Sequence, residues 1–102
     1  MEFIEIQRSL VNTLLKIPEM EQGEGRTSIL DGLPSVGLDR QSSARLDLNR
    51  MLNGLEKMGR LTKAGGVRPI MVVVENALAF VPDGSAIADE LHASKKQLED
   101  YY

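Results

Sequence analysis

The sequence predicts an all-α fold: a compact bundle of five or six short helices in one domain spanning residues 1–102. Three observations lead to this prediction. The most apolar run, residues 68–82, has helical spacing, and the apolar residues of the flanking segments recur at intervals of three and four. The chain has 102 residues, of which 42% are hydrophobic, and this is enough for one small core.

The run 68–82 is predicted to be the helix around which the others pack. Residues 72–74 would also suit a strand, because β-branched side chains fit a pleated surface. The distance between Pro69 and Pro82 favours a helix, because it exceeds the length of an ordinary strand and Pro69 occupies a favoured first helical position. We therefore expect a helix over 69–81 that is buried on nearly all sides. Its expected core residues are Val74 and Leu78, surrounded by Leu10, Leu14, Leu52 and Leu55.

Residues 2–17 are predicted to form the first helix. Phe3, Ile6 and Leu10 begin an apolar face that continues to Ile17, and Pro18 ends it. Residues 19–25 are acidic and contain glycine, which indicates a loop or a frayed turn. A short second helix is expected within residues 25–34, with Thr27 as its N-cap and Gly32 as its C-terminal stop.

A third helix is expected from a cap at Ser42 or Ser43 to about Met58, where Gly59 closes it. Its apolar face runs from Leu48 to Met58, and its polar residues, Asp47 included, are assigned mostly to the other faces. Residues 60–67 form the connection to the apolar run. After a turn at 82–85, the last helix begins at about Ala86.

Residue types that carry catalysis or bind metals are sparse. There is no cysteine, and His92 is the one histidine; Asp89 and Glu90 beside it diverge on a helix, so they do not form a metal site with it. No glycine pattern matches a phosphate-binding loop. We therefore expect no enzymatic activity, no metal and no cofactor. Acidic residues at 2 and 5 argue against a signal peptide, and no apolar run is long enough to span a membrane, which favours a cytoplasmic protein.

Charge is unevenly distributed along the chain, although the net charge is only −3. Residues 1–25 carry five acids and two bases, residues 26–68 carry four acids and eight bases, and residues 69–102 carry six acids and two bases. Either this is ordinary scatter on solvated helices, or it creates basic and acidic surfaces that attract one another between molecules. The candidate interaction residues are the basic Arg26, Arg40, Arg45, Arg50 and Arg60, and the acidic Glu2, Glu5, Glu19, Glu21, Asp89 and Glu90.

Asn76 lies inside the apolar run and must find a partner. We expect a structural hydrogen bond to a loop carbonyl or amide across the edge of the core. The alternative is an exposed contact at a partner surface.

Three stretches together resemble a known family. They are residues 25–34 (GRTSILDGLP), residues 44–48 (ARLDL) with 55–59 (LEKMG), and residues 68–70 (RPI) with 75–78 (ENAL). They resemble the bacterial effector-associated domains, small helical modules related in character to death-fold domains. The resemblance extends from residue 6 to residue 91, mostly at core and turn positions, and includes no catalytic signature.

This resemblance implies a death-fold-like bundle that acts as a homotypic adaptor. Such a domain would bind a like domain on another polypeptide, with homo-oligomers or filaments possible. It would thereby bring a peptidase or nucleotide-switch effector of bacterial immunity, antiphage defence or programmed cell death to its sensor. The alternatives are a generic helical domain and a nucleic-acid-binding regulator. The negative net charge and the dispersed arginines make nucleic acid the less favoured ligand.

Overall fold

The computed structural model describes residues 2–33, 40–58 and 67–102, and every regular element in these residues is helical. The elements are α1 (Phe3–Leu14), the 3-10 helix η1 (Pro18–Glu21), α2 (Gly23–Ser28), α3 (Ala44–Met58), α4 (Pro69–Leu78) and α5 (Ala86–Tyr101). The prediction of an all-α bundle of five or six short helices is confirmed. Residues 35–41, between the second and third predicted helices, and the predicted connection 60–67 fall almost entirely outside the described residues.

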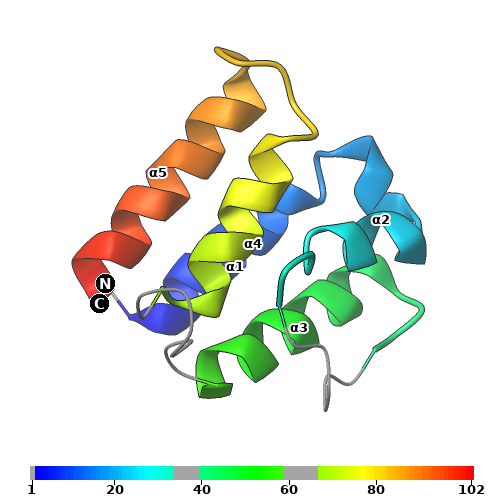
Figure 1. Ribbon diagram of the computed structural model, residues 1–102, viewed down its shortest axis with the longest axis horizontal. Coiled ribbons are helices and arrows are strands. Elements are labelled where there is room, and N and C mark those ends of the chain that lie inside the picture. Colours follow the sequence, from blue (N-terminus) through cyan, green and yellow to red (C-terminus); the bar gives the residue numbers. More distant parts are fainter. Residues whose placement is uncertain (1, 34–39, 59–66) are drawn as a thin grey trace.

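Four helices form a closed ring of contacts, which we call the four-helix ring. α1 packs against α5, α5 against α4, α4 against α3, and α3 against α1 (Figure 1). Between them lies an aliphatic core, as the scarcity of aromatic residues predicts. Its members include Leu10, Leu14, Leu48, Leu52, Leu55, Val73, Val74, Leu91 and Leu98, all buried.

α4 is one member of this ring and not the helix around which the others pack. The expected burial on nearly all sides is confirmed, because Glu75 is the one exposed residue within Pro69–Leu78. Ile70, Val73 and Val74 are buried as predicted, whereas Leu78 is half-buried and Glu75 is exposed. α4 packs mainly against α3 and α5, and its remaining side is only partly covered. The helix also ends at Leu78, and the chain continues to residue 81 in tighter turns.

α1 ends at Leu14, three residues before the predicted end. The N–H groups of Lys16 and Ile17 bond to carbonyls three residues back, and Ile17 has extended backbone because it precedes Pro18. Pro18 then opens η1 at a position where no N–H is needed. The side chain of Ile17 is still fully buried, so the apolar pattern is correct although the helix boundary is not.

The segment 19–25 was predicted to be a loop or a frayed turn. In the structure it holds the end of η1 and the first half of α2. Thr27 does not cap α2; it lies in its last turn and donates from Oγ1 to the carbonyl of Gly23 at 2.9 Å. Gly25 explains the close packing of α2 on η1. A Cβ at residue 25 would lie 1.9 Å from the carbonyl oxygen of Glu19, so only glycine fits there.

α3 and α5 begin where the sequence predicts. α3 follows Ser43, and α5 follows Ser85, whose Oγ accepts from the N–H of Ala88 at 3.2 Å. Gly32, expected to stop the second helix, adopts a left-handed φ of 82° four residues beyond its end, in the turns that follow α2.

The start of α1 and the end of α5 lie together at one end of the molecule (Figure 1). The rings of Phe3 and Tyr101 have centroids 5.7 Å apart, and the guanidinium of Arg68 lies 4.1 Å from the centroid of Tyr102. The hydroxyl of Tyr102 also bonds to the carboxylate of Glu56. These contacts join α1, α3, α4 and α5 at the end of the ring opposite α2.

Candidate interaction surface

Two of the five predicted basic residues belong to an internal network. Arg26 is 3% exposed, which corrects its assignment to a surface patch. Its Nε lies 2.6 Å from Oδ2 of Asp47, and its Nη1 donates to the carbonyls of Met20 at 2.7 Å and Glu21 at 3.1 Å. One guanidinium thus joins α2, η1 and α3.

Arg40 approaches the same carboxylate from the solvent side. Its Nε and Nη2 each lie 2.9 Å from an oxygen of Asp47, and its Nη1 donates to Oγ1 of Thr27 at 2.8 Å. The side chain is 33% exposed. Arg40 is therefore accessible, as predicted, but its donors are already engaged within the molecule.

Asp47 is the shared acceptor of this Arg26–Asp47–Arg40 network and is fully buried. Burial alone would raise the pKa of its carboxyl group. Hydrogen bonds from Arg40, Arg26 and the backbone N–H of Gln41 outweigh burial and lower the pKa to about 2. The carboxylate is therefore ionised at neutral pH. The sequence analysis placed Asp47 on an outer face of the helix, and this was wrong.

The outer side of α3 is the strongest candidate interaction surface. Its exposed side chains recur at helical spacing, and we call them the α3 face: Arg45, Leu46, Arg50, Asn53 and Lys57. Leu46 is 43% exposed and is one of four large apolar side chains exposed in the described residues. Arg45 also reaches across to α1, where its Nη1 donates to Oδ1 of Asn12 at 2.9 Å.

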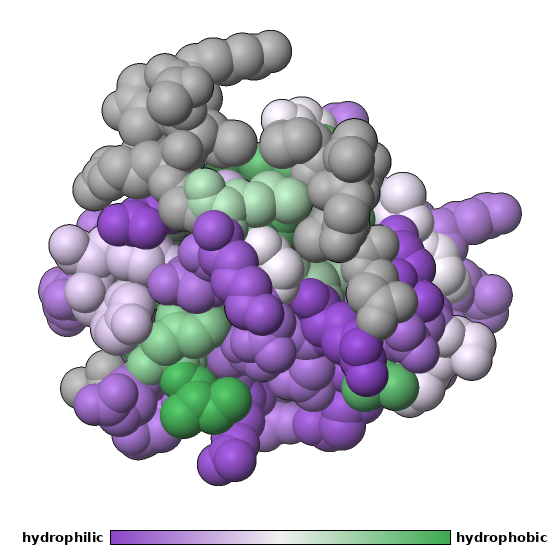
Figure 2. Space-filling view, turned by 90° about the horizontal axis from the view of Figure 1, so that it is seen from below, coloured by the Kyte–Doolittle hydropathy of each residue, from purple (hydrophilic) through white to green (hydrophobic). Residues whose placement is uncertain are grey.

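The α3 face carries three cationic side chains, Arg45, Arg50 and Lys57, and no acidic residue. Of the two acidic residues in α3, Asp47 is buried under Arg26 and Arg40, and Glu56 bonds to the hydroxyl of Tyr102. Figure 2 shows the molecule from below the view of Figure 1, which is the side where α3 lies. This side is mainly hydrophilic, with small separate hydrophobic groups, so apolar burial alone would not make it an interface. Arg60 lies outside the described residues.

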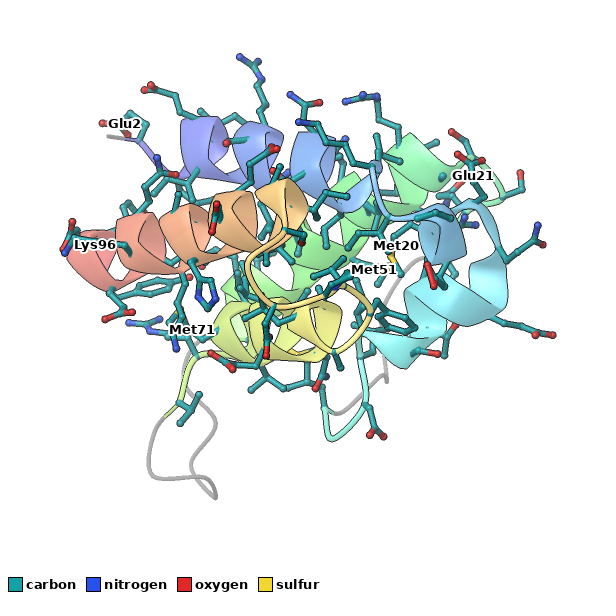
Figure 3. The ribbon with its side chains drawn as sticks, turned by 90° about the horizontal axis from the view of Figure 1, so that it is seen from above. Glu2, Met20, Glu21, Met51, Met71 and Lys96 are labelled. Atoms are coloured by element: carbon teal, nitrogen blue, oxygen red, sulfur yellow. The ribbon has the colours of Figure 1, made fainter. Side chains whose placement is uncertain are left out.

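The predicted acidic residues do not form one surface. Glu2 and Glu21 lie at opposite ends of the molecule (Figure 3). Glu5 accepts from the N–H of Glu2 at 3.4 Å at the start of α1, and Asp89 is exposed in the first turn of α5. Glu19 and Glu21 are both exposed on η1. Together with Glu24 on α2, which the sequence analysis did not select, they form three exposed acids at the η1–α2 junction, here called the acidic corner.

Glu90 has an internal role. Its carboxylate bonds to Nζ of Lys16 at 2.8 and 2.9 Å and accepts from the hydroxyl of Thr13 at 3.2 Å. The hydrogen bond from Lys16 is the main reason that the pKa of Glu90 is lowered. Glu90 thus links α5 to α1, and Glu75 with Lys95 makes a similar link between α4 and α5 at 2.6 Å.

Asn76 makes the structural contact that the sequence analysis favoured. Its Nδ2 donates to the carbonyl oxygens of Ile29 at 3.0 Å and Asp31 at 2.9 Å. These carbonyls follow α2, where the chain has left the helix and its backbone needs other partners. Asn76 therefore ties the turn after α2 to α4 across the edge of the core.

No model of a protein family, no curated protein and no solved structure matches the chain. Within residues 2–33, 40–58 and 67–102, no three His, Cys, Asp or Glu side chains come together in a way that could hold a metal ion. None of the helices described is long and apolar enough to cross a lipid bilayer.

Proposed function

We propose that this domain is a non-enzymatic adaptor that binds a related helical domain on another protein. As in the effector-associated domains that the sequence resembles, it would recruit a peptidase or nucleotide-switch effector of bacterial immunity or cell death to its sensor. We place it in the cytoplasm, where such effectors act. The observation that carries the proposal is the α3 face, a basic surface with an exposed leucine and no acidic residue among its members.

The α3 face suits a protein partner that is acidic and has a shallow apolar site. Arg45 and Arg50 flank Leu46, so an ionic rim would surround an apolar contact, as in many protein interfaces. A single exposed ion pair contributes only about 0–1 kcal/mol. Affinity must therefore come from several pairs together with the burial of Leu46.

The acidic corner supplies a matching surface of opposite charge on the same domain. Glu19, Glu21 and Glu24 are exposed on η1 and α2, while Arg26 between them and α3 points inward and does not neutralise them from outside. If a like domain carries both surfaces, the α3 face of one copy meets the acidic corner of the next. Such a contact between unlike surfaces is heterologous and propagates into a ring or a filament.

The test is the self-association of the chain, measured by sedimentation velocity across salt concentrations and in charge-reversed variants. Association is expected to weaken as salt rises from about 0.05 to 0.5 M, because the Debye length falls from about 14 Å to about 4 Å. The double variant Arg45→Glu/Arg50→Glu should abolish it. The single variants Arg50→Glu and Lys96→Glu change the charge equally, but Lys96 lies on α5, so only Arg50→Glu should weaken association.

The same variants separate this proposal from nucleic-acid binding, which the basic and amide side chains of the α3 face would also suit. Fluorescence anisotropy with labelled duplex DNA measures that activity directly. DNA binding that is lost in Arg45→Glu/Arg50→Glu, with no protein self-association at any salt concentration, would replace the adaptor by a nucleic-acid-binding domain. Association that ignores both salt and charge reversal would rule out the α3 face as the interface.

A further inference from the structure

Two neighbouring hydroxyl groups on α2 have nearly the same environment. Thr27 and Ser28 are both exposed, and each donates to the carbonyl four residues earlier, Gly23 at 2.9 Å and Glu24 at 3.0 Å. They differ in one contact. Oγ1 of Thr27 also accepts from Nη1 of Arg40 at 2.8 Å, whereas the Ser28 hydroxyl makes no second hydrogen bond within residues 2–33, 40–58 and 67–102.

The surroundings of Thr27 are rich in positive charge. Arg26 and Arg40 share one carboxylate, that of Asp47, so the Arg26–Asp47–Arg40 network carries an excess of one positive charge. Arg40 is its solvent-accessible member, with 33% of the side chain exposed. Glu24, three residues before Thr27 on the same helix, opposes an added anion. A negative group at residue 27 would therefore depend on Arg40.

We propose that Thr27 is a phosphorylation site and that Arg40 binds its phosphate. A separate kinase would transfer the γ-phosphoryl group of a nucleoside triphosphate to Oγ1. The new P–Oγ1 bond forms as the bond to the bridging oxygen of the nucleotide breaks, the hydroxyl proton is released and the nucleoside diphosphate departs. Thr27 is already exposed in the last turn of α2, so its hydroxyl faces solvent without any opening of the buried Arg26–Asp47 pair.

A phosphate at Thr27 would change the partners of Arg40. The esterified oxygen can no longer donate to Gly23, and the phosphate offers up to two negative charges and three acceptor oxygens. A guanidinium binds phosphate well through two parallel hydrogen bonds. Arg40 would therefore turn toward the phosphate and away from Asp47, which keeps Arg26 and the N–H of Gln41.

This change would be transmitted to α3 without unfolding the domain. Asp47 lies in the first turn of α3, directly after Arg45 and Leu46. The buried bond between Arg26 and Asp47 would continue to join α2 to α3, while the backbone at residues 40 and 41 loses one of its attachments. Phosphorylation would thus alter charge beside the first turn of α3 and leave the core intact.

The experiment installs phosphothreonine at residue 27 during synthesis of the full chain and titrates it by ³¹P NMR. The control is the same chain with phosphoserine at residue 28. If Arg40 binds the phosphate, the phosphate dianion at residue 27 should bind a proton roughly tenfold more weakly than the dianion at residue 28, because a nearby cation favours the dianion. Arg40→Gln should remove this difference, and Arg40→Lys should retain part of it.

Circular dichroism melting of each phosphorylated chain establishes that the domain is folded during the titration. Equal proton affinities at residues 27 and 28 in the folded chains would overturn the proposal. A difference that persists unchanged in Arg40→Gln would overturn it as well, because the cation responsible would then not be Arg40. If Arg40→Gln does not fold, Arg40→Lys decides the question. If the Arg40→Lys chain titrates like the chain with Arg40, the guanidinium does not bind the phosphate through two parallel hydrogen bonds.

Discussion

The four-helix ring and the segment formed by η1 and α2 are held in place by different interactions. The ring encloses buried aliphatic side chains contributed by α1, α3, α4 and α5. Its ion pairs, Lys16–Glu90 and Glu75–Lys95, lie at the surface. α2 by contrast contains no apolar residue, and it is fixed by Arg26, Arg40 and Asp47 together with the close fit of Gly25.

This difference shows how a helix without an apolar face can be specified. Six residues are too few to form a stable helix on their own in water. Arg26 donates to the carbonyls of Met20 and Glu21 and to the buried Asp47, so a single side chain satisfies backbone groups at the end of η1 and fixes α2 against α3. Because these bonds come from one inward-facing side chain, Glu24 and Thr27 on the outer side of α2 stay exposed.

The largest effect is expected when the buried ion pair is broken. Arg26→Met removes one partner of the fully buried Asp47 and should lower the free energy of unfolding by about 3–5 kcal/mol. Arg40→Met should cost clearly less, because Arg40 is one-third exposed and Asp47 keeps Arg26. Urea titration of both variants measures the difference. Equal costs would show that burial does not distinguish the two arginines.

The next effect concerns the ring itself. Leu52→Ala deletes a fully buried side chain from α3 and should cost about 2–5 kcal/mol. The sequence analysis placed Leu78 in the core as well, but Leu78 is half-buried, so Leu78→Ala is expected to cost only about 1–2 kcal/mol. Thermal unfolding should show a lower midpoint for Leu52→Ala. The reverse order would mean that the outer side of α4 is covered in solution.

A smaller effect should follow from protonating Asp47. The pKa of its carboxyl group is about 2 in the folded protein, below its ordinary value in an unfolded chain. The stability that this group contributes is therefore fully present above about pH 4 and is lost as pH falls toward 2. Urea titrations between pH 5 and pH 2.5 should show this loss. Asp47→Asn, compared over the same range, should show a weaker dependence on pH, and an unchanged slope would assign the acid sensitivity to other carboxylates.

The sequence predicted the helices of the ring well, because the spacing of their apolar residues indicates which face of each helix is buried. Residues 3–17 and 48–58 and the run 68–82 each repeat at three and four, and each forms a helix with the expected face inward. The η1–α2 segment was missed because it has no such repeat. Its determinants are Gly25 and the bond from Arg26 to Asp47, which lies 21 residues away along the chain. Asp47 could have been recognised. It precedes Met51 by four and Leu55 by eight residues, which places it on the buried face of α3, where an acid requires a cationic partner.

The charged surfaces could be predicted only in part, because sequence position does not reveal that Arg26 turns inward while Arg45 and Arg50 do not.

The last and smallest effect is expected at the junction between the two regions. Asn76 of α4, in the ring, donates to the carbonyls of Ile29 and Asp31 in the turns that follow α2. Asn76→Ala leaves two backbone acceptors without this donor and should cost about 1–3 kcal/mol, toward the lower end because the Asp31 carbonyl can bond to water. Asn76→Asp is the informative companion, because it keeps the size of the side chain but replaces the donor by a carboxylate facing two carbonyl oxygens. It should be at least as destabilising as Asn76→Ala at pH 7.

Hydrogen exchange in both variants should increase first in residues 23–33 and leave the amides of α5 protected. Uniform loss of protection would show that the η1–α2 segment and the ring unfold as one unit, and the contrast between their stabilising interactions would then have no counterpart in local stability.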